Sequence, residues 1–103
     1  MTDKRPAHKV FFETLANTVR WDIVHALQDD QKRASDIAAM VDAEQSLVSH
    51  HLTRLRECGF VNVTKQGRER VYSLNKKTME PLLAIMDEHI RNHCESCKFR
   101  KLS

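Results

Sequence analysis

The sequence predicts a single, mainly α-helical domain that carries one β-hairpin. Three observations support this prediction. The length of 103 residues suits one hydrophobic core, apolar residues recur at helical spacing in five stretches, and Gly67 separates two short strand-like runs. Charged residues make up 30% of the chain and hydrophobic residues 41%, which is typical of a globular protein rather than a disordered one. We therefore expect residues 1–103 to form one domain.

Several predicted elements have a local signal at their start or end. Asn17 is a suitable N-cap for the second helix, Gly59 suits the position after the fourth, and Pro81 fits the first turn of the last. The acidic side chains of the turn over 42–44 can cap the helix that follows. In chain order, the helices are expected over 7–15, 18–28, 35–41, 45–57 and 78–93, and the strands over 61–65 and 69–74.

A short helix directly before a longer one, followed by a hairpin, is the order of a winged helix-turn-helix. The helix-turn-helix would cover residues 35–57 and the wing residues 61–74. The last helix and a basic, cysteine-containing tail over 94–103 would follow the wing.

The predicted helix over 45–57 has one apolar and one polar side, at about 100° per residue. The apolar side holds Leu47, Val48, His51, Leu52, Leu55 and Cys58. The polar side holds Gln45, Ser46, Ser49, His50, Thr53 and Arg56, with Arg54 at its edge. Glutamine can bond adenine through two hydrogen bonds, serine and threonine adapt to several partners, and arginine reaches guanine or phosphate. The polar side therefore suits a DNA major groove, whereas the alternative is an ordinary solvated surface.

Charge is concentrated in the same part of the chain, which favours DNA over the solvated surface. Residues 45–77 carry seven basic and two acidic side chains, although the whole chain has a net charge of only +3. At the hairpin turn, Lys65, Arg68 and Arg70 could reach the adjacent minor groove or the phosphates. The alternative for these three is a solvated hairpin edge that resists aggregation.

Two residues of the longer helix should have structural roles. His51 lies with the apolar residues, so we expect a buried histidine with a hydrogen-bond partner at the core or at a hinge. Cys58 also points inward beside Gly59, and we expect it to be a packing thiol.

A longer pattern contains these residues. It reads Phe12-x-x-Leu15-Ala16-Asn17-x-x-Arg20, then Ser46-Leu47-Val48-Ser49-His50-His51-Leu52-x-x-Leu55-Arg56-Glu57-x-Gly59, then Gly67-Arg68-x-x-x-Tyr72-Ser73-Leu74. Over about residues 10–75 it resembles the ArsR/SmtB family. The resemblance implies a homodimeric winged-helix repressor that leaves its DNA operator when an inducer binds. It also implies a dimer interface made by the first and last helices, and a groove-reading segment over 45–54. Two-fold symmetry then predicts a pseudo-palindromic operator in double-stranded DNA.

The metal sites of that family do not carry over as sets. The segment Arg33-Ala34-Ser35-Asp36-Ile37 stands where many members have two cysteines. The ligand positions that other members have near the last helix fall on Lys76, Thr78, His89 and Asn92. Of those four, only His89 can ligate a metal ion in the usual way.

The last helix has a pattern of its own. Met79, Leu82, Leu83, Met86 and Ile90 form an apolar stripe that suits a partner helix. His89, His93 and Cys97 follow that stripe at four-residue spacing, with Cys94 at its edge. These four could hold a transition-metal or metalloid ion, completed by a second chain at a two-fold interface. Two alternatives stay open: Cys94 and Cys97 form a thiol redox switch, or the histidines pack at an interface and the tail binds nothing.

Other classes of protein are disfavoured. The longest apolar run, Leu82–Met86, is too short for a membrane span or a signal peptide. The odd count of three cysteines suits a reducing cytoplasm. We expect no enzyme, because the Cys94–Cys97 pair follows a helix end, where the helix dipole opposes a thiolate. The main rival is an architectural or protein-binding winged helix that does not read DNA sequence.

Overall fold

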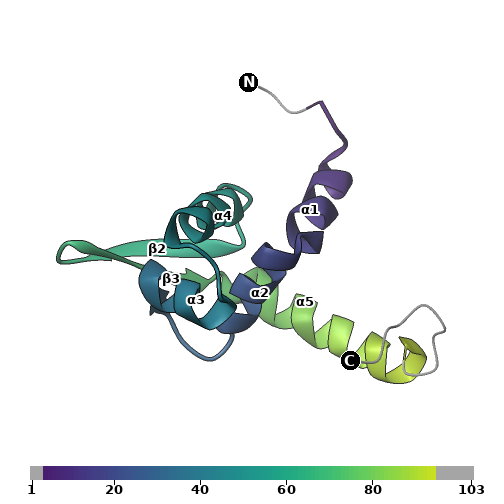
Figure 1. Ribbon diagram of the computed structural model, residues 1–103. Helices are drawn as coiled ribbons and strands as arrows, with labels where there is room; N and C mark the ends of the chain where they lie inside the picture. The colour runs from purple at the N-terminus through teal and green to yellow at the C-terminus, as the bar shows by residue number, and fades with distance from the viewer. Residues whose placement is uncertain (1–3, 95–103) are drawn as a thin grey trace.

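The computed structural model describes residues 4–94 (Figure 1). For Cys94 it describes the backbone only. Residues 95–103 of the predicted tail, which include Cys97, lie outside the described part of the chain. The helices are α1 (Ala7–Ala16), α2 (Thr18–Ala26), α3 (Ala34–Val41), α4 (Gln45–Glu57) and α5 (Lys76–His89), and a π-helical turn, η1 (Ile90–Cys94), continues α5. The strands are β1 (Lys32–Arg33), β2 (Val61–Gln66) and β3 (Glu69–Leu74).

The predicted helices and hairpin are all present, and one strand was not predicted. β1 pairs antiparallel with β3, so the described sheet has three strands in the order β1-β3-β2. Its register places Lys32 opposite Tyr72, while Val63 faces Tyr72 from the other edge. A two-residue strand shows no alternation of apolar and polar residues, which is why the sequence pattern did not reveal it.

Local signals account for several boundaries. The Asn17 side chain accepts a hydrogen bond from the Arg20 backbone N–H at 3.1 Å, which confirms the predicted N-cap of α2. Gly59 and Gly67 have φ values of +82° and +66°, the left-handed conformation that a side chain disfavours. They let the chain turn after α4 and at the tip of the wing.

Two predictions about helix starts are wrong. Glu44 occupies the N-cap position of α4, but its side chain makes no capping hydrogen bond, and Asp42 ends α3 with a left-handed φ of 53°. Pro81 lies inside α5 rather than in its first turn, because that helix starts earlier than expected, at Lys76. Asn75 causes the early start. Its backbone N–H donates to the Phe60 carbonyl at 2.9 Å, and its own carbonyl accepts from Met79 at 2.8 Å.

The core lies where α2, α3 and α4 meet the base of the hairpin and the first half of α5. Its largest fully buried side chains include Ile23, Ile37, Leu52, Leu55, Phe60 and Met79. On α4 the buried side consists of Val48, His51, Leu52 and Leu55. Leu47 was expected on that side but is 43% exposed, because it lies at the edge of the buried arc in the first turn.

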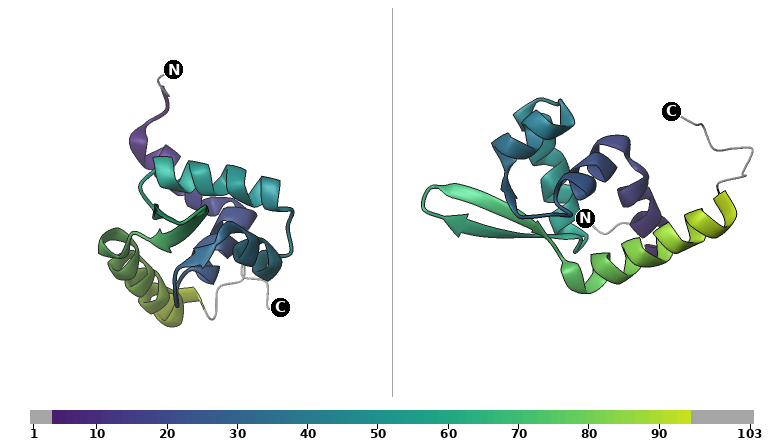
Figure 2. Two further views of the ribbon diagram at one scale, coloured as in Figure 1. Left: turned by 90° about the vertical axis from the view of Figure 1, so that its left-hand side faces the viewer. Right: turned by 90° about the horizontal axis from the view of Figure 1, so that it is seen from below.

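The wing and the far half of α5 extend from the core in opposite directions (Figures 1 and 2). α1 and α5 leave the core on the side away from the wing and diverge from each other, and α4 lies on the wing side of the core (Figure 1). Across residues 4–94, no helix is long and apolar enough to span a bilayer. The fold thus separates a polar face, made by α4 and the wing, from an apolar face made by α1 and α5.

Candidate nucleic-acid interface

A polar groove of about 370 Å³ runs between α4 and the wing. It is lined by Gln45, Ser49 and Thr53 from α4, by Arg68, Glu69, Arg70 and Tyr72 from the wing, and by Arg33, Ala34 and Ser35 at the start of α3. Five of the residues predicted to contact DNA therefore lie together, although they come from two separate segments.

The other predicted contacts surround this groove or extend its surface. Ser46, His50 and Arg56 are exposed on the outer side of α4, and Lys65 is exposed near the tip of the wing. Thr53 is also exposed, but its hydroxyl already donates to the Ser49 carbonyl at 3.1 Å. Exposed polar and basic side chains are thus found on α4 and on the wing around the groove.

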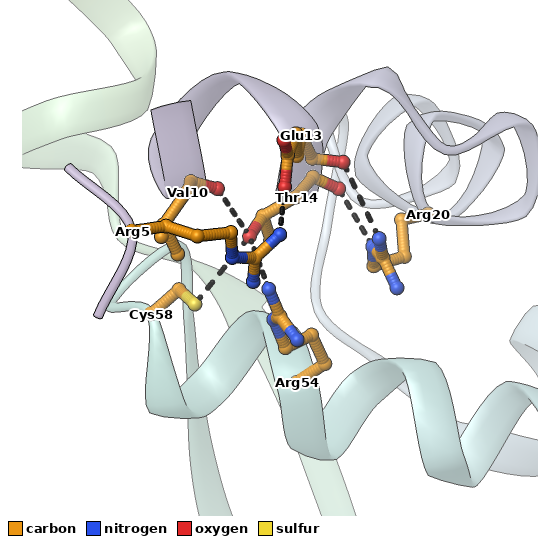
Figure 3. A network of polar contacts seen from close by, with 7 residues as sticks. All are labelled: Arg5, Val10, Glu13, Thr14, Arg20, Arg54 and Cys58. Atoms are coloured by element: carbon orange, nitrogen blue, oxygen red, sulfur yellow. Dashed lines mark hydrogen bonds and ion pairs between the residues drawn. The ribbon is translucent and has the colours of Figure 1, made fainter. Parts of the chain in front are cut away.

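Arg54 lies apart from that surface. Its Nη2 donates to the Thr14 hydroxyl of α1 at 3.3 Å (Figure 3). Its Nε is buried and has no hydrogen-bond partner among residues 4–94. The structure therefore places this arginine, which was expected at the edge of the polar side, at the contact between α4 and α1.

Arg33 lines the groove and was not among the predicted residues. Its Nη1 donates to both carboxylate oxygens of Glu69 at 3.1 Å, and its Nε donates to Asp36 at 3.1 Å. These hydrogen bonds raise the pKa of Arg33, and the bond to Asp36 has a larger effect than the bonds to Glu69. Because all three side chains are about half exposed, solvent screens the charges and the network adds little stability. Its effect is to pair the one acidic group of the wing and to tie β3 to the start of α3.

His51 confirms the prediction of a buried histidine with a partner. It is 9% exposed, and Nη1 of Arg20 lies 3.2 Å from its Nδ1. Because arginine can only donate, Nδ1 must be the acceptor, which assigns the ring proton to Nε2. Burial lowers the pKa of His51, and the charges of Arg20 and His50 lower it further.

Cys58 is half-buried, and its Sγ lies 3.6 Å from the Thr14 hydroxyl (Figure 3). This contact agrees with the expected packing role. Thr14 itself is fully buried in α1. No periodic signal distinguished it in the sequence, because its importance depends on contacts with residues far away in the chain.

The predicted apolar stripe of the last helix divides into two parts. Met79 and Leu83 are buried in the core, whereas Leu82 and Met86 are half-buried and Ile90 is 40% exposed. His89 and His93 are exposed, with ring centroids 4.7 Å apart. Within residues 4–94, no group of three or more His, Cys, Asp or Glu side chains is arranged to hold a metal ion. The predicted ligands Cys94 and Cys97 cannot be placed beside the histidines, because neither side chain is described.

Known proteins that are similar to this chain are described as transcriptional or regulatory proteins. The family described as bacterial regulatory protein, arsR family, matches residues 17–63. A crystal structure of a possible transcriptional regulator for arsenical resistance is 32% identical, covers 76% of this chain and 81% of its own, and has a TM-score of 0.63. This chain belongs to the ArsR family. The family consists of regulatory proteins, in line with the expectation that the chain is not an enzyme.

Curated relatives match over shorter parts. The cadmium resistance transcriptional regulatory protein CadC of Listeria innocua is 39% identical over 64 residues, or 61% of this chain and 54% of CadC. The regulator NmtR of Mycobacterium tuberculosis is 37% identical over 71 residues, or 69% of this chain and 59% of NmtR. This chain thus spans about half the length of these relatives.

Solved structures confirm the winged helix-turn-helix fold. The homodimeric DNA-binding domain of Mb0332 from Mycobacterium bovis superposes with a TM-score of 0.78 over 92% of this chain and 88% of its own, at 20% identity. Reduced HlyU from Vibrio cholerae gives 0.68 over 85% and 90%, at 27% identity.

The position of His51 predicts a loss of stability in acid. Because the pKa of His51 is lowered in the folded state, protonation favours the unfolded chain. Stability should be complete above the unfolded histidine pKa of about 6.5 and decrease as the pH falls below it. Urea denaturation at pH 7.5 and 5.5 measures the decrease. It should be smaller in His51→Asn, which keeps an acceptor for Arg20 without titrating, than in the control His50→Asn. Equal decreases in the two variants would exclude His51 as the source.

Proposed function

We propose that this chain is a sequence-specific DNA-binding transcriptional regulator that represses its target genes. The observation that carries the proposal is the groove shared by α4 and the wing, where polar, uncharged side chains lie beside arginines. A major groove is wide enough for one α-helix, and base edges are read by short polar side chains near the helix N-terminus.

In this proposal the N-terminal half of α4 enters the major groove. Gln45, Ser46, Ser49 and His50 would contact base edges, and Thr53 the adjoining sugar or phosphate. Arg56, Lys65, Arg68 and Arg70 would contact phosphates or the neighbouring minor groove. Arg54 is omitted from these contacts, because its guanidinium already bonds Thr14.

The first test is selection of duplexes from a random 30-base-pair library by the purified protein. A sequence-reading regulator should enrich a pseudo-palindrome and bind it at least ~10³-fold more tightly than random DNA. A ratio near one would show an architectural winged helix instead, and the proposal would then be abandoned.

The wing arginines can be tested with the selected duplex. Arg68→Ala should weaken binding to the selected and to the random duplex alike, and should lower the slope of log affinity against log salt by about 1. Arg91→Ala, on η1 far from the wing, is the matched control and should leave the slope unchanged (Figure 1). An unchanged slope in Arg68→Ala would remove Arg68 from the phosphate contacts.

We also propose that the protein acts as a homodimer through α1 and α5. An apolar groove of about 520 Å³ between α1, α2 and α5 is lined by Phe11, Phe12, Leu15, Ala16, Thr18, Trp21, Leu82 and Met86. Phe12 in this groove and Ile85 on α5 are each 66% exposed, which is unusual for large apolar side chains that stay in water. A second copy would cover this surface and present two α4 helices about one DNA turn apart, ~34 Å.

Sedimentation velocity tests the dimer. Ile85→Glu should sediment as a monomer, because a carboxylate would be buried without a partner at the interface. Met40→Glu is the control, since Met40 is 57% exposed on α3 and lies outside the α1–α5 surface. If the parent and Ile85→Glu sediment alike, this interface is wrong.

The inducer is proposed to act at the end of α5. His89 and His93 are neighbours there and could supply two imidazole ligands to a zinc-like ion, with Cys94 and Cys97 as the remaining ligands or as an oxidisable pair. An inducer of either kind must favour the dimer geometry that does not bind DNA. Typical coupling of ~1–3 kcal/mol corresponds to a 5- to 150-fold change in affinity.

Cysteine variants test this site. The double variant Cys94→Ser, Cys97→Ser should bind the selected duplex as the parent does. It should lose any release of DNA by zinc, cadmium or peroxide, and it should bind less metal in elemental analysis. Cys58→Ser is the control, because that thiol contacts Thr14 rather than α5. A double variant that responds like the parent would exclude the two tail cysteines.

A further inference from the structure

The C-terminal end of α1 is held by a side chain of the next helix. The last carbonyls of an α-helix have no partner within the helix. Arg20 of α2 supplies partners for two of them: Nε donates to the Thr14 carbonyl at 2.6 Å, and Nη2 donates to the Glu13 carbonyl at 3.3 Å (Figure 3). A cation is also favoured at this end of a helix dipole. Arg20 therefore caps α1.

The same guanidinium also contacts α4. The third nitrogen of Arg20, Nη1, bonds Nδ1 of His51 at 3.2 Å. A second connection runs beside it, where Arg54 of α4 donates to the Thr14 hydroxyl at 3.3 Å and that hydroxyl donates to the Val10 carbonyl at 2.7 Å. Two hydrogen-bonded routes thus join α4 to α1, and both involve Thr14 or Arg20.

The chemistry of this cluster requires a fixed geometry. Burial and the charge of Arg54 both lower the pKa of Arg20, so the two guanidinium groups repel each other. All of their acceptors are neutral: two carbonyls and an imidazole accept from Arg20, and a hydroxyl accepts from Arg54. A planar guanidinium can satisfy three such acceptors at once, which a lysine ammonium on a flexible chain cannot do in the same positions.

We propose that Arg20 and Thr14 are positioning residues for DNA recognition, which lock α4 onto α1 so that the dimer sets the spacing of the two recognition helices. The inference rests on the proposed function. According to this inference, α1 and α2, which lie far from the wing in the sequence, contribute to operator binding without touching DNA.

Arg20→Lys tests the lock while keeping the charge. Operator affinity at pH 7.5 should fall about tenfold, the equivalent of roughly one charge-assisted hydrogen bond. Sedimentation and the salt slope should be unchanged, whereas loss of a phosphate contact would lower that slope by about 1. Thr14→Val, which replaces the hydroxyl with a methyl group, provides a second variant if Arg20→Lys is unfolded by low concentrations of urea. Affinity equal to that of the parent in a folded variant would overturn the proposal.

A pH profile separates positioning from simple structural support. The charged or titratable groups around His51 are Arg20 from α2 and His50 from its own helix, with Arg54 and Cys58 in the same cluster. Protonation of His51 removes the lone pair that accepts from Arg20, so affinity for the selected duplex should fall in acid. Because burial lowers the pKa of His51 in the folded protein, the fall should come at a lower pH than the ordinary histidine pKa of about 6.5. The profile is measured in a His50→Asn background, because His50 is itself one of the proposed DNA contacts.

In that background, adding His51→Asn should abolish the acid-dependent fall, since asparagine keeps an acceptor and does not titrate. Identical profiles with and without His51→Asn would overturn the proposal. If the parent selects no sequence at all, the DNA-reading function fails instead, so the two failures are distinguishable.

Discussion

The burial of one side of α4 is the constraint on which the rest of the molecule depends. Val48, Leu52 and Leu55 are completely buried against the neighbouring helices and the hairpin. Burying a leucine side chain contributes about 1.5–3 kcal/mol, so this seam fixes the rotation of the helix about its axis. Once that rotation is fixed, Ser46 and His50 must face outward, and Gln45, Ser49 and Thr53 must face the wing.

The flank of α4 that is turned away from the wing forms hydrogen bonds with α1 and α2. There, His51 and Arg54 bond Arg20 and Thr14, and none of these four side chains lines the polar groove. One helix therefore presents a polar groove on one flank and a hydrogen-bonded junction with α1 on the other. If α1 forms the dimer interface, any change in that interface reaches α4 through a short chain of directed bonds rather than through loosely packed side chains.

The one acidic side chain of the wing, Glu69, is neutralised by a nearby arginine. Glu69 stands between two arginines on the surface proposed to meet phosphates, where a free carboxylate would repel DNA. Arg33, at the start of α3, is the counter-ion of Glu69, and its Nη1 donates to both carboxylate oxygens. The wing keeps its basic character while gaining a fixed attachment to the helix-turn-helix.

The sequence by itself determined the order and type of the elements, the buried side of α4 and the polar residues opposite it. These features depend on periodicity and on local caps such as Asn17, which act between residues close in the chain. Only the tertiary structure decided which polar residues share the groove, because partners such as Arg33 and Glu69 are brought together by sheet pairing. The same holds for Arg54, whose place at the edge of the helix allowed either the groove or α1. Packing of α1 beside α4 supplied the Thr14 hydroxyl and thereby settled its orientation, which no pattern within a single helix could reveal.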